Sequence, residues 1–239
     1  MILPKVVTFT GPDDSVDAGE LIALSKDYPN TEWGILFGAK DSGSGRFPSL
    51  DWLDSEIPLL EAEGLNLTAH LCGKWVYELV LFGDFTWLHY YGDKITRAFQ
   101  RVQLNFHGQK YPPAAKTFLD RIGEEPYQFI FQDDTVNGHL PGPLGTDKRV
   151  RLFDVSHGAG TLPEGDGNPW PKRTTKEYMG YAGGLGPQNI STQLKLIEQA
   201  AAPSKYGPYW IDMETKVRSG GDSLFDLSKC RSVCKQVWG

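Results

Sequence analysis

VRLFDVSHGAG, at Val150–Gly160, joins a short apolar strand pattern to an aspartate and then to a glycine-rich turn. A carboxylate at the end of a strand, followed directly by such a turn, is typical of the sites of α/β proteins. Asp154 is therefore the first candidate functional residue of the chain. Its alternative role is structural, because a carboxylate in this position also accepts hydrogen bonds from the amides of its own loop.

The same pattern, a strand followed by a connecting segment, recurs along the whole chain. Strands are expected at Val6–Phe9, Trp33–Phe37, Leu65–Leu71, Arg101–Phe106, Tyr127–Phe131, Val150–Asp154, Tyr178–Ala182 and Trp210–Met213. Helices are expected from Ser15, as the cap, to about Leu24, and at Leu50–Ala62, Ala114–Ile122, Ile190–Ala202 and Phe225–Val237. Eight such units without a linker predict one (β/α)8 barrel over residues 1–239. An open doubly wound sheet is the alternative, and it would normally carry a phosphate fingerprint after the first strand, where this chain has none.

Two segments depart from this regular plan. The stretch after the third strand holds the aromatic residues Trp75, Tyr77, Phe82, Phe85, Trp87, Tyr90 and Tyr91. We expect two helices there with a turn at Gly83-Asp84, and residues 75–91 are a candidate surface for homo-oligomer formation. Between the fifth and sixth strands, residues 132–149 are rich in glycine and proline and show no helical period.

Composition and charge limit the class of partner. The formal net charge is −6, and no run of lysine or arginine occurs, which excludes nucleic acid or an anionic membrane surface as an expected partner. No apolar run approaches the roughly 18 residues of a membrane span, and no signal-peptide pattern precedes the first strand. Three cysteines are too few for a disulfide framework. A cytoplasmic location is therefore expected.

The predicted barrel brings distant polar residues to one mouth, because the carboxyl ends of all its strands open there. The strand ends and the loop after the second strand carry Thr10, Arg46, His70, Cys72, His107, Asp133, Asp154 and Asp212. This set offers acids, imidazoles, a thiol and a guanidinium, which is more than a barrel needs for stability. Each residue type also has a structural alternative, such as a hydrogen-bonded histidine, a packed cysteine or a solvated arginine.

The segment YAGGLGPQNI, residues 181–190, predicts an anion site. Gly183 and Gly184 would let backbone amides approach a phosphate, and a helix begins directly afterwards. Phosphate sites of barrels frequently lie after the seventh and eighth strands. Gly220 and Gly221, after the eighth strand, would supply the other half of the site. The alternative at both places is a plain tight turn.

In chain order, these motifs resemble those of phosphoribosylanthranilate isomerase, a single-domain (β/α)8 barrel of the ribulose-phosphate-binding type from tryptophan biosynthesis. The resemblance is carried by Gly45-Arg46-Phe47, Val102-Gln103-Leu104 with His107-Gly108, Leu152-Phe153-Asp154 with Gly158-Ala159-Gly160, residues 182–190, and Ile211-Asp212 through Asp226. It implies an aldose–ketose (Amadori-type) isomerase that binds a small phosphorylated sugar or ribonucleotide-like anion, without a cofactor or a metal.

The resemblance also implies roles for individual residues. Asp154 would be the general acid that protonates the ring oxygen. Arg46, His107 and Asp212 would contact the substrate, with the planar guanidinium of Arg46 on a carboxylate. The phosphate would lie on the amides near Gly184 and on those after the eighth strand.

The chain departs from the family pattern at the general base. The family has Cys-Gly at the end of the first strand, whereas this chain has Thr10-Gly11, and a threonine hydroxyl is a poor base near neutral pH. Cys72 beside His70 is one replacement, since a neighbouring imidazole can activate a thiol. Asp13 or Asp14 is another.

A second departure lies after the eighth strand. Glu214-Thr215-Lys216 stands where the family has Ser-Ser-Gly, and the added bulk and charge should alter the phosphate cup. The alternative function is therefore a non-catalytic barrel that binds a phosphorylated ligand, or serves as a scaffold, after loss of the base.

Overall fold

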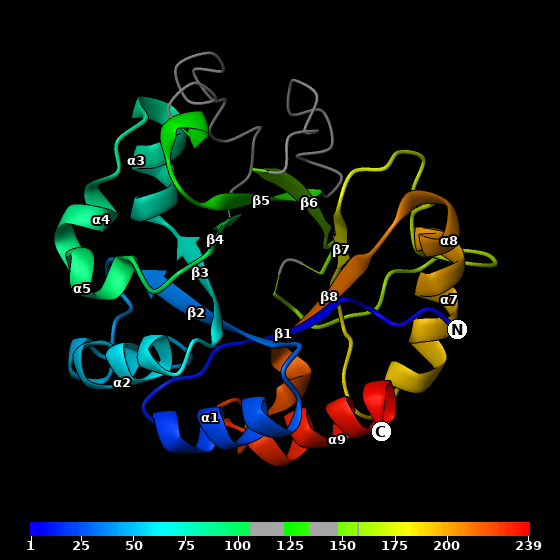
Figure 1. The fold of residues 1–239 in the computed structure, drawn as a ribbon, viewed down its shortest axis with the longest axis horizontal. Coiled ribbons are helices and arrows are strands. Elements are labelled where there is room, and N and C mark those ends of the chain that lie inside the picture. The colour runs from blue at the N-terminus through cyan, green and yellow to red at the C-terminus, as the bar shows by residue number, and fades with distance from the viewer. Residues whose placement is uncertain (106–121, 134–147, 157) are drawn as a thin grey trace.

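The fold is a closed barrel of parallel strands surrounded by helices, seen down the barrel in Figure 1. We analysed a computed structural model, which describes residues 1–105, 122–133, 148–156 and 158–239. The strands are β1 (Val6–Thr10), β2 (Thr31–Gly38), β3 (Asn66–Cys72), β4 (Arg101–Asn105), β5 (Gln128–Asp133), β6 (Arg149–Phe153), β7 (Met179–Tyr181) and β8 (Tyr209–Met213). Pairing of β1 with β8 closes the barrel. The predicted (β/α)8 barrel is confirmed, and the open doubly wound sheet is wrong.

The helices lie outside the ring of strands (Figure 1). They are α1 (Ala18–Asp27), α2 (Leu50–Ala62), α3 (Lys74–Phe82), α4 (Thr86–Tyr91), α5 (Asp93–Thr96), α7 (Ile190–Ala201), α8 (Pro203–Tyr206) and α9 (Leu227–Trp238). A short 3-10 helix, η1 (Thr215–Val217), and a hairpin of β9 (Arg218–Ser219) and β10 (Leu224–Phe225) follow β8. Among the described residues, no helix has the length and apolar character needed to cross a membrane.

The predicted cap of the first helix is wrong. The helix begins after Asp17, whose side chain accepts from the backbone N–H of Glu20 in a reciprocal capping box. Ser15 is engaged elsewhere, since its hydroxyl donates to Asp13 Oδ1 at 2.6 Å. It also accepts from the backbone N–H of Phe225 at 3.0 Å, which ties the β1 loop to the β10 strand.

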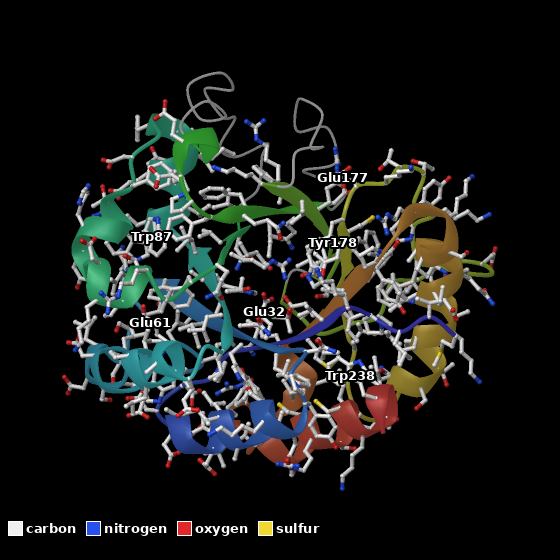
Figure 2. All side chains as sticks on the ribbon, viewed as in Figure 1. Glu32, Glu61, Trp87, Glu177, Tyr178 and Trp238 are labelled. Atoms are coloured by element: carbon white, nitrogen blue, oxygen red, sulfur yellow. The ribbon has the colours of Figure 1, made fainter. Side chains whose placement is uncertain are left out.

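Alternation along the strands divides apolar from polar positions. On β1, Val7 and Phe9 are fully buried in the main core, which also contains the buried faces of the helices. Thr8 and Thr10 alternate with them and form hydrogen bonds with carboxylates of other strands, Glu32 and Asp212. Glu32 and Tyr178 lie within the ring of strands (Figure 2). The barrel interior therefore combines these polar groups with a separate apolar cluster of Ile130, Val150, Leu152, Ala182 and Trp210.

A buried ion pair forms part of that interior. Glu32 accepts hydrogen bonds from Arg101 Nη1 at 2.9 Å and from Thr8 Oγ1 at 2.7 Å. The Arg101 guanidinium also lies over the Trp210 ring, 4.3 Å from its centroid. Both charges are thus paired inside the protein, which a buried ion requires.

The aromatic segment after β3 mainly builds the core. Trp75, Trp87 and Tyr91 are buried, and the Phe37 ring contacts those of Trp87, Tyr91 and Phe99 at centroid distances of 5.9, 4.8 and 5.4 Å. Of the aromatic side chains described between residues 75 and 91, Phe82 and Tyr90 are the exposed ones. Oligomer formation through this segment stays a prediction, and these two rings are what it would use.

Two predicted features cannot be compared with the structure. The helix expected at Ala114–Ile122 lies outside the described residues except for its last position. The glycine- and proline-rich connection between β5 and β6 lies outside them over residues 134–147.

Gly34 on β2 permits a close approach inside the barrel. A Cβ added there would collide with Thr10 Oγ1 and would lie 2.8 Å from His70 Nε2. We expect Gly34→Ala to lower the free energy of unfolding by about 1–3 kcal/mol, because buried side chains on β1 and β3 must move apart. Urea denaturation measures this value. The matched control is Gly123→Ala, whose new Cβ would have its nearest neighbour at 3.8 Å. Equal stability of the two variants would contradict the close approach.

Candidate active site

Two adjoining pockets open at the carboxyl ends of the strands. The larger, of about 260 Å³, is lined by Leu36, Arg46, Phe47, Cys72, Gln103, Asn105, Gln132, Asp154, Gly158 and Glu214. The smaller, of about 40 Å³, lies toward β7 and β8 and includes Gly183, Gly184, Asp212, Thr215 and Lys216. Gln103, Asp154, Gly158 and Glu214 line both. The structure thus brings together Asp154, Arg46, Cys72, Asp212 and the Gly183-Gly184 turn.

Asp154 follows β6 and is held by donors on both of its oxygens. Oδ1 accepts from the backbone N–H and the hydroxyl of Ser156, at 2.9 and 2.7 Å. Oδ2 accepts from Gln132 Nε2 at 3.3 Å. The hydrogen bonds from Ser156 are those that the structural role predicted for Asp154 would use. Asp154 also lines both pockets, which a catalytic role requires. The two roles are therefore compatible in this residue.

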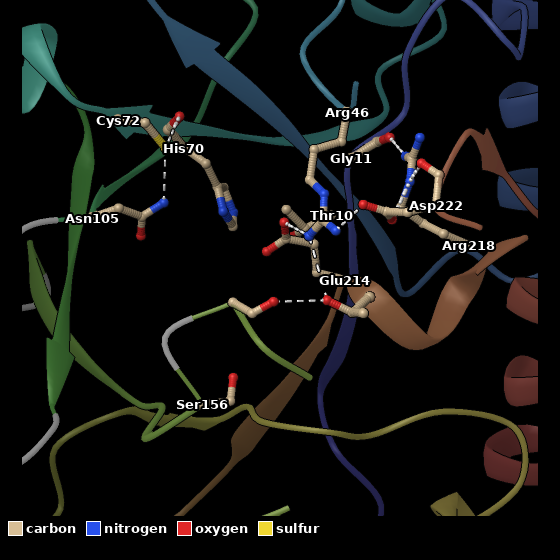
Figure 3. A network of polar contacts seen from close by, with 12 residues as sticks. Thr10, Gly11, Arg46, His70, Cys72, Asn105, Ser156, Glu214, Arg218 and Asp222 are labelled. Carbon is tan, nitrogen blue, oxygen red and sulfur yellow. Dashed lines mark hydrogen bonds and ion pairs between the residues drawn. The ribbon is translucent and has the colours of Figure 1, made fainter. Parts of the chain in front are cut away.

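Arg46 is held at the mouth by two carboxylates. Its Nη1 bonds with Glu214 and its Nη2 with Asp222, the latter at 2.5 Å (Figure 3). Asp222 lies on the turn of the β9–β10 hairpin, so Arg46 joins the loop after β2 to the segment after β8. Its side chain keeps 18% exposure, so a ligand can still reach it.

Glu214 is a site residue that sequence reasoning did not identify as catalytic. It directly follows β8 and lines both pockets. Burial raises the pKa of its carboxyl, while Arg46 opposes the shift and the Asp154 carboxylate adds to it. A carboxylate with a raised pKa is a stronger base than an ordinary one. The sequence feature that could have indicated Glu214 is the replacement of the first serine of the family's Ser-Ser-Gly by an acidic residue.

Cys72 and His70 occupy neighbouring inward positions of β3, but their reactive groups do not meet. The thiol bonds with the backbone carbonyl of His70, at 3.9 Å, and accepts from Asn105 Nδ2 at 3.3 Å (Figure 3). Burial raises the pKa of Cys72 to about 12. Burial, and then the charge of Arg101, lowers the pKa of His70 to about 3. The Cys72 thiol therefore keeps its proton, and the His70 imidazole is a weak base, so neither residue is suited to be the general base.

Thr10 does not line either pocket, although it stands where the family has cysteine. Its hydroxyl donates to Asp212 Oδ1 at 2.9 Å, and both residues are buried. Burial raises the pKa of Asp212 well above its usual range, and the carboxylates Glu214, Glu32 and Asp154 add to the effect. Thr10 therefore positions Asp212, which lines the smaller pocket.

The two N-terminal aspartates considered as bases have structural partners. Asp13 pairs with Arg218 Nη2 at 2.5 Å and accepts from Ser15. Asp14 accepts from the backbone N–H of Ser49 at 2.8 Å, next to the start of α2. Neither lines the two pockets at the mouth.

The turn after β7 forms one wall of the smaller pocket. Gly184 has φ +65°, and a Cβ added there would lie 2.5 Å from the backbone N of Leu162, so a side chain would not fit. Thr215 and Lys216 of η1 also line this pocket. Gly220 and Gly221, predicted to supply the other half of the anion site, lie instead on the turn between β9 and β10 and do not line the pocket.

The remaining predicted features lie outside the described residues or concern metals. His107, predicted to contact the substrate, is not among the described residues. Among those that are described, no group of three or more histidine, cysteine, aspartate or glutamate side chains could hold a metal ion. Gln103, Asn105 and Gln132 were not predicted as site residues, and their signal was the period of two that puts polar residues on the inner face of β4 and β5.

Comparisons with known proteins place this architecture among solved structures. No protein-family model and no curated protein matches the sequence. The structure is similar to TrpF from Jonesia denitrificans, with 16% identity over 97% of this chain and 96% of that one, at a TM-score of 0.58. It is similar to phosphoribosyl anthranilate isomerase from Thermus thermophilus, with 15% identity over 97% of both chains and a TM-score of 0.57.

A structure of a GH113 β-1,4-mannanase is also similar, with 12% identity over 99% of both chains and a TM-score of 0.53. One barrel architecture thus covers chains of different chemistry, and likeness at these identities concerns the fold alone. The chain is a (β/α)8 barrel with the architecture of phosphoribosylanthranilate isomerase.

Proposed function

We propose that this protein binds a small phosphorylated sugar or ribonucleotide-like anion at the barrel mouth and isomerises it from aldose to ketose. The observation that carries the proposal is the pair Asp154 and Glu214, which line both adjoining pockets. Two carboxylates on one ligand space, in different environments, suit acid and base roles. The glycine turn and the lysine in the smaller pocket supply the anion contacts.

The smaller pocket would hold the phosphate. Gly183 and Gly184 permit close approach of the backbone, and both have positive φ. Lys216 brings a cation to the same space, and the start of its side chain packs against Gly186. Lys216 stands where the family motif has a glycine. The smaller pocket therefore gains a positive charge, which favours an anion.

The larger pocket would hold the sugar and the reacting atoms. Asp154 donates a proton to the ring oxygen as the bond from that oxygen to C1 breaks, which gives the open-chain aldose with its carbonyl oxygen still protonated. Glu214 then takes the proton from C2, and the electron pair of that C–H bond forms the C1=C2 double bond of the neutral enediol. Return of a proton to C1 and loss of one from the C2 hydroxyl give the ketose, so the reaction consumes and releases no net proton.

A second candidate, the non-catalytic binding barrel, is favoured by the position of Thr10. Its buried hydroxyl donates a hydrogen bond to Asp212, and Thr10 does not line the larger pocket. The two candidates share phosphate binding, and proton transfer at C2 belongs to the isomerase alone.

Crystals grown with ribose 5-phosphate test the proposed function. We expect the phosphate between Gly184 and Lys216, with the sugar against Asp154. The control is Lys216→Gln, which removes the cation but keeps much of the side chain and should weaken binding about tenfold, as the loss of one charge-assisted contact predicts. A ligand bound elsewhere, or equal binding by the variant, would count against the assigned phosphate site.

A further inference from the structure

Gln103 on β4 has a buried side-chain acceptor without a partner and lies at the wall of the ligand space. The residue is 6% exposed and lines both pockets at the mouth. Its Oε1 is buried and lacks a hydrogen-bond partner among the described residues. An unpaired buried acceptor is costly, and a donor from a ligand would satisfy it.

The direction of this amide is set by its neighbours. Gln103 Nε2 donates to Asn105 Oδ1 at 2.8 Å, which leaves Gln103 Oε1 without a partner. Asn105 Nδ2 in turn donates to Cys72 Sγ at 3.3 Å, so the asparagine oxygen must face Gln103. The chain ends at the Cys72 thiol, which donates to the backbone carbonyl of His70 at 3.9 Å (Figure 3).

The protonation of Cys72 makes that direction stable. Because burial raises the pKa of its thiol to about 12, the sulfur keeps its proton at neutral pH. The thiol donates this proton to the His70 carbonyl, so its sulfur accepts the hydrogen bond from Asn105 Nδ2. Each amide in the chain is thereby oriented, and the glutamine carbonyl is the group left for the ligand.

We propose that Gln103 selects ligands by accepting a hydrogen bond from a hydroxyl of the sugar, and that Asn105 and Cys72 are positioning residues that fix its amide. This inference rests on the proposed function, because the sugar of a phosphorylated ligand is what brings the hydroxyl into the larger pocket. It gives Cys72 a role other than base or nucleophile. A keto or carboxylate oxygen at the same place would face the glutamine oxygen without a proton between them.

Calorimetric titration with ribose 5-phosphate and with inorganic phosphate tests the role of Gln103. The wild type should bind ribose 5-phosphate more tightly than phosphate. Gln103→Met keeps the side-chain volume but removes the acceptor. It should weaken the binding of ribose 5-phosphate about tenfold, as the loss of one buried hydrogen bond predicts. Its affinity for inorganic phosphate should remain within about twofold, since the proposed phosphate contacts are the Gly183-Gly184 turn and Lys216 and do not include the Gln103 amide.

Two variants of Cys72 test the positioning role. Cys72→Val removes the sulfur acceptor at similar volume, so the amides can turn and the preference for ribose 5-phosphate should fall severalfold. Cys72→Ser restores a group that donates to the His70 carbonyl and accepts from Asn105, and it should recover the preference. If Cys72 had only a structural role, the two variants would differ in thermal stability, and their preference for ribose 5-phosphate over inorganic phosphate would equal that of the wild type.

The outcomes separate this inference from the proposed function. Unchanged preference in Gln103→Met, with phosphate still bound, would overturn the role of Gln103 and leave the phosphate site standing. If the wild type binds neither compound, the phosphorylated-sugar function is wrong and the inference falls with it. If Cys72→Ser behaves as Cys72→Val, the positioning chain is wrong.

Discussion

Asp154→Asn should lower kcat/KM for isomerisation by about 10²- to 10⁴-fold, the usual contribution of a general acid. Asparagine keeps an oxygen that can accept from Ser156, so the loop after β6 should hold its shape. The amide has no proton to give to the ring oxygen, and the loss should appear in turnover rather than in binding. The rate is measured in heavy water as formation of the ketose, with deuterium at C1, from ribose 5-phosphate.

The matched control for this variant is Asp133→Asn. Asp133 also ends a strand, β5, but it pairs with Arg151 at 3.5 Å and does not line the two pockets at the mouth. Its variant should keep the wild-type rate within about twofold, as expected for a change outside the site. Equal loss in both variants, or full activity in Asp154→Asn, would remove Asp154 from the chemistry.

Glu214→Gln should give opposite effects on turnover and on binding. Turnover should fall about 10²- to 10⁴-fold because the base is lost. Binding of an anion that contacts Arg46 should strengthen severalfold, since the neutral amide no longer competes for the guanidinium. Calorimetry and the deuterium assay together measure this split. A fall in both, with the fold intact, would show that Glu214 serves binding alone.

Asp222→Asn provides the control for Glu214. Asp222 also pairs with Arg46, but it lies on an exposed turn and does not line the pockets. Its variant should strengthen anion binding and keep the wild-type turnover. The contrast between the two carboxylates separates release of Arg46 from loss of the base.

The pH dependence of the rate follows from the same carboxyl. A base acts in its deprotonated form, so kcat/KM should fall as the pH drops through the pKa of Glu214. Burial raises that pKa above the usual value of a glutamate, and the decline should therefore begin at a higher pH than for an ordinary carboxylate. In Glu214→Gln this acidic limb should disappear from the residual rate.

The barrel could be predicted because short apolar strand segments and the turns that follow them are local features of the sequence. Each strand lies within about two residues of its predicted range, and the helix Leu50–Ala62 has the predicted bounds. The first helix begins later than expected because Ser15 bonds with Asp13 and Phe225, and the second of these lies 210 positions away in the chain. Such long-range partners leave no periodic signal.

The site was predictable in part, for the same reason. Asp154 and the Gly183-Gly184 turn follow strands directly, where sequence position alone indicates the mouth. Glu214 was not predicted as a catalytic residue because its environment depends on the ion pair with Arg46, which lies 168 positions away in the chain. The thiol of Cys72 looked reactive beside His70, but burial and Asn105 decide its state, and neither can be read from the two residues alone.

Formation of the ketose from ribose 5-phosphate, with deuterium at C1, followed by proton NMR in heavy water with the wild-type protein, tests the central claim most directly. Removal of the C2 proton by Glu214 is the step that distinguishes an isomerase from a binding barrel. We expect the ketose to appear with solvent deuterium at C1, and we expect no ketose with Glu214→Gln. Binding of ribose 5-phosphate at the mouth without any ketose formed would contradict the isomerase and leave the non-catalytic barrel.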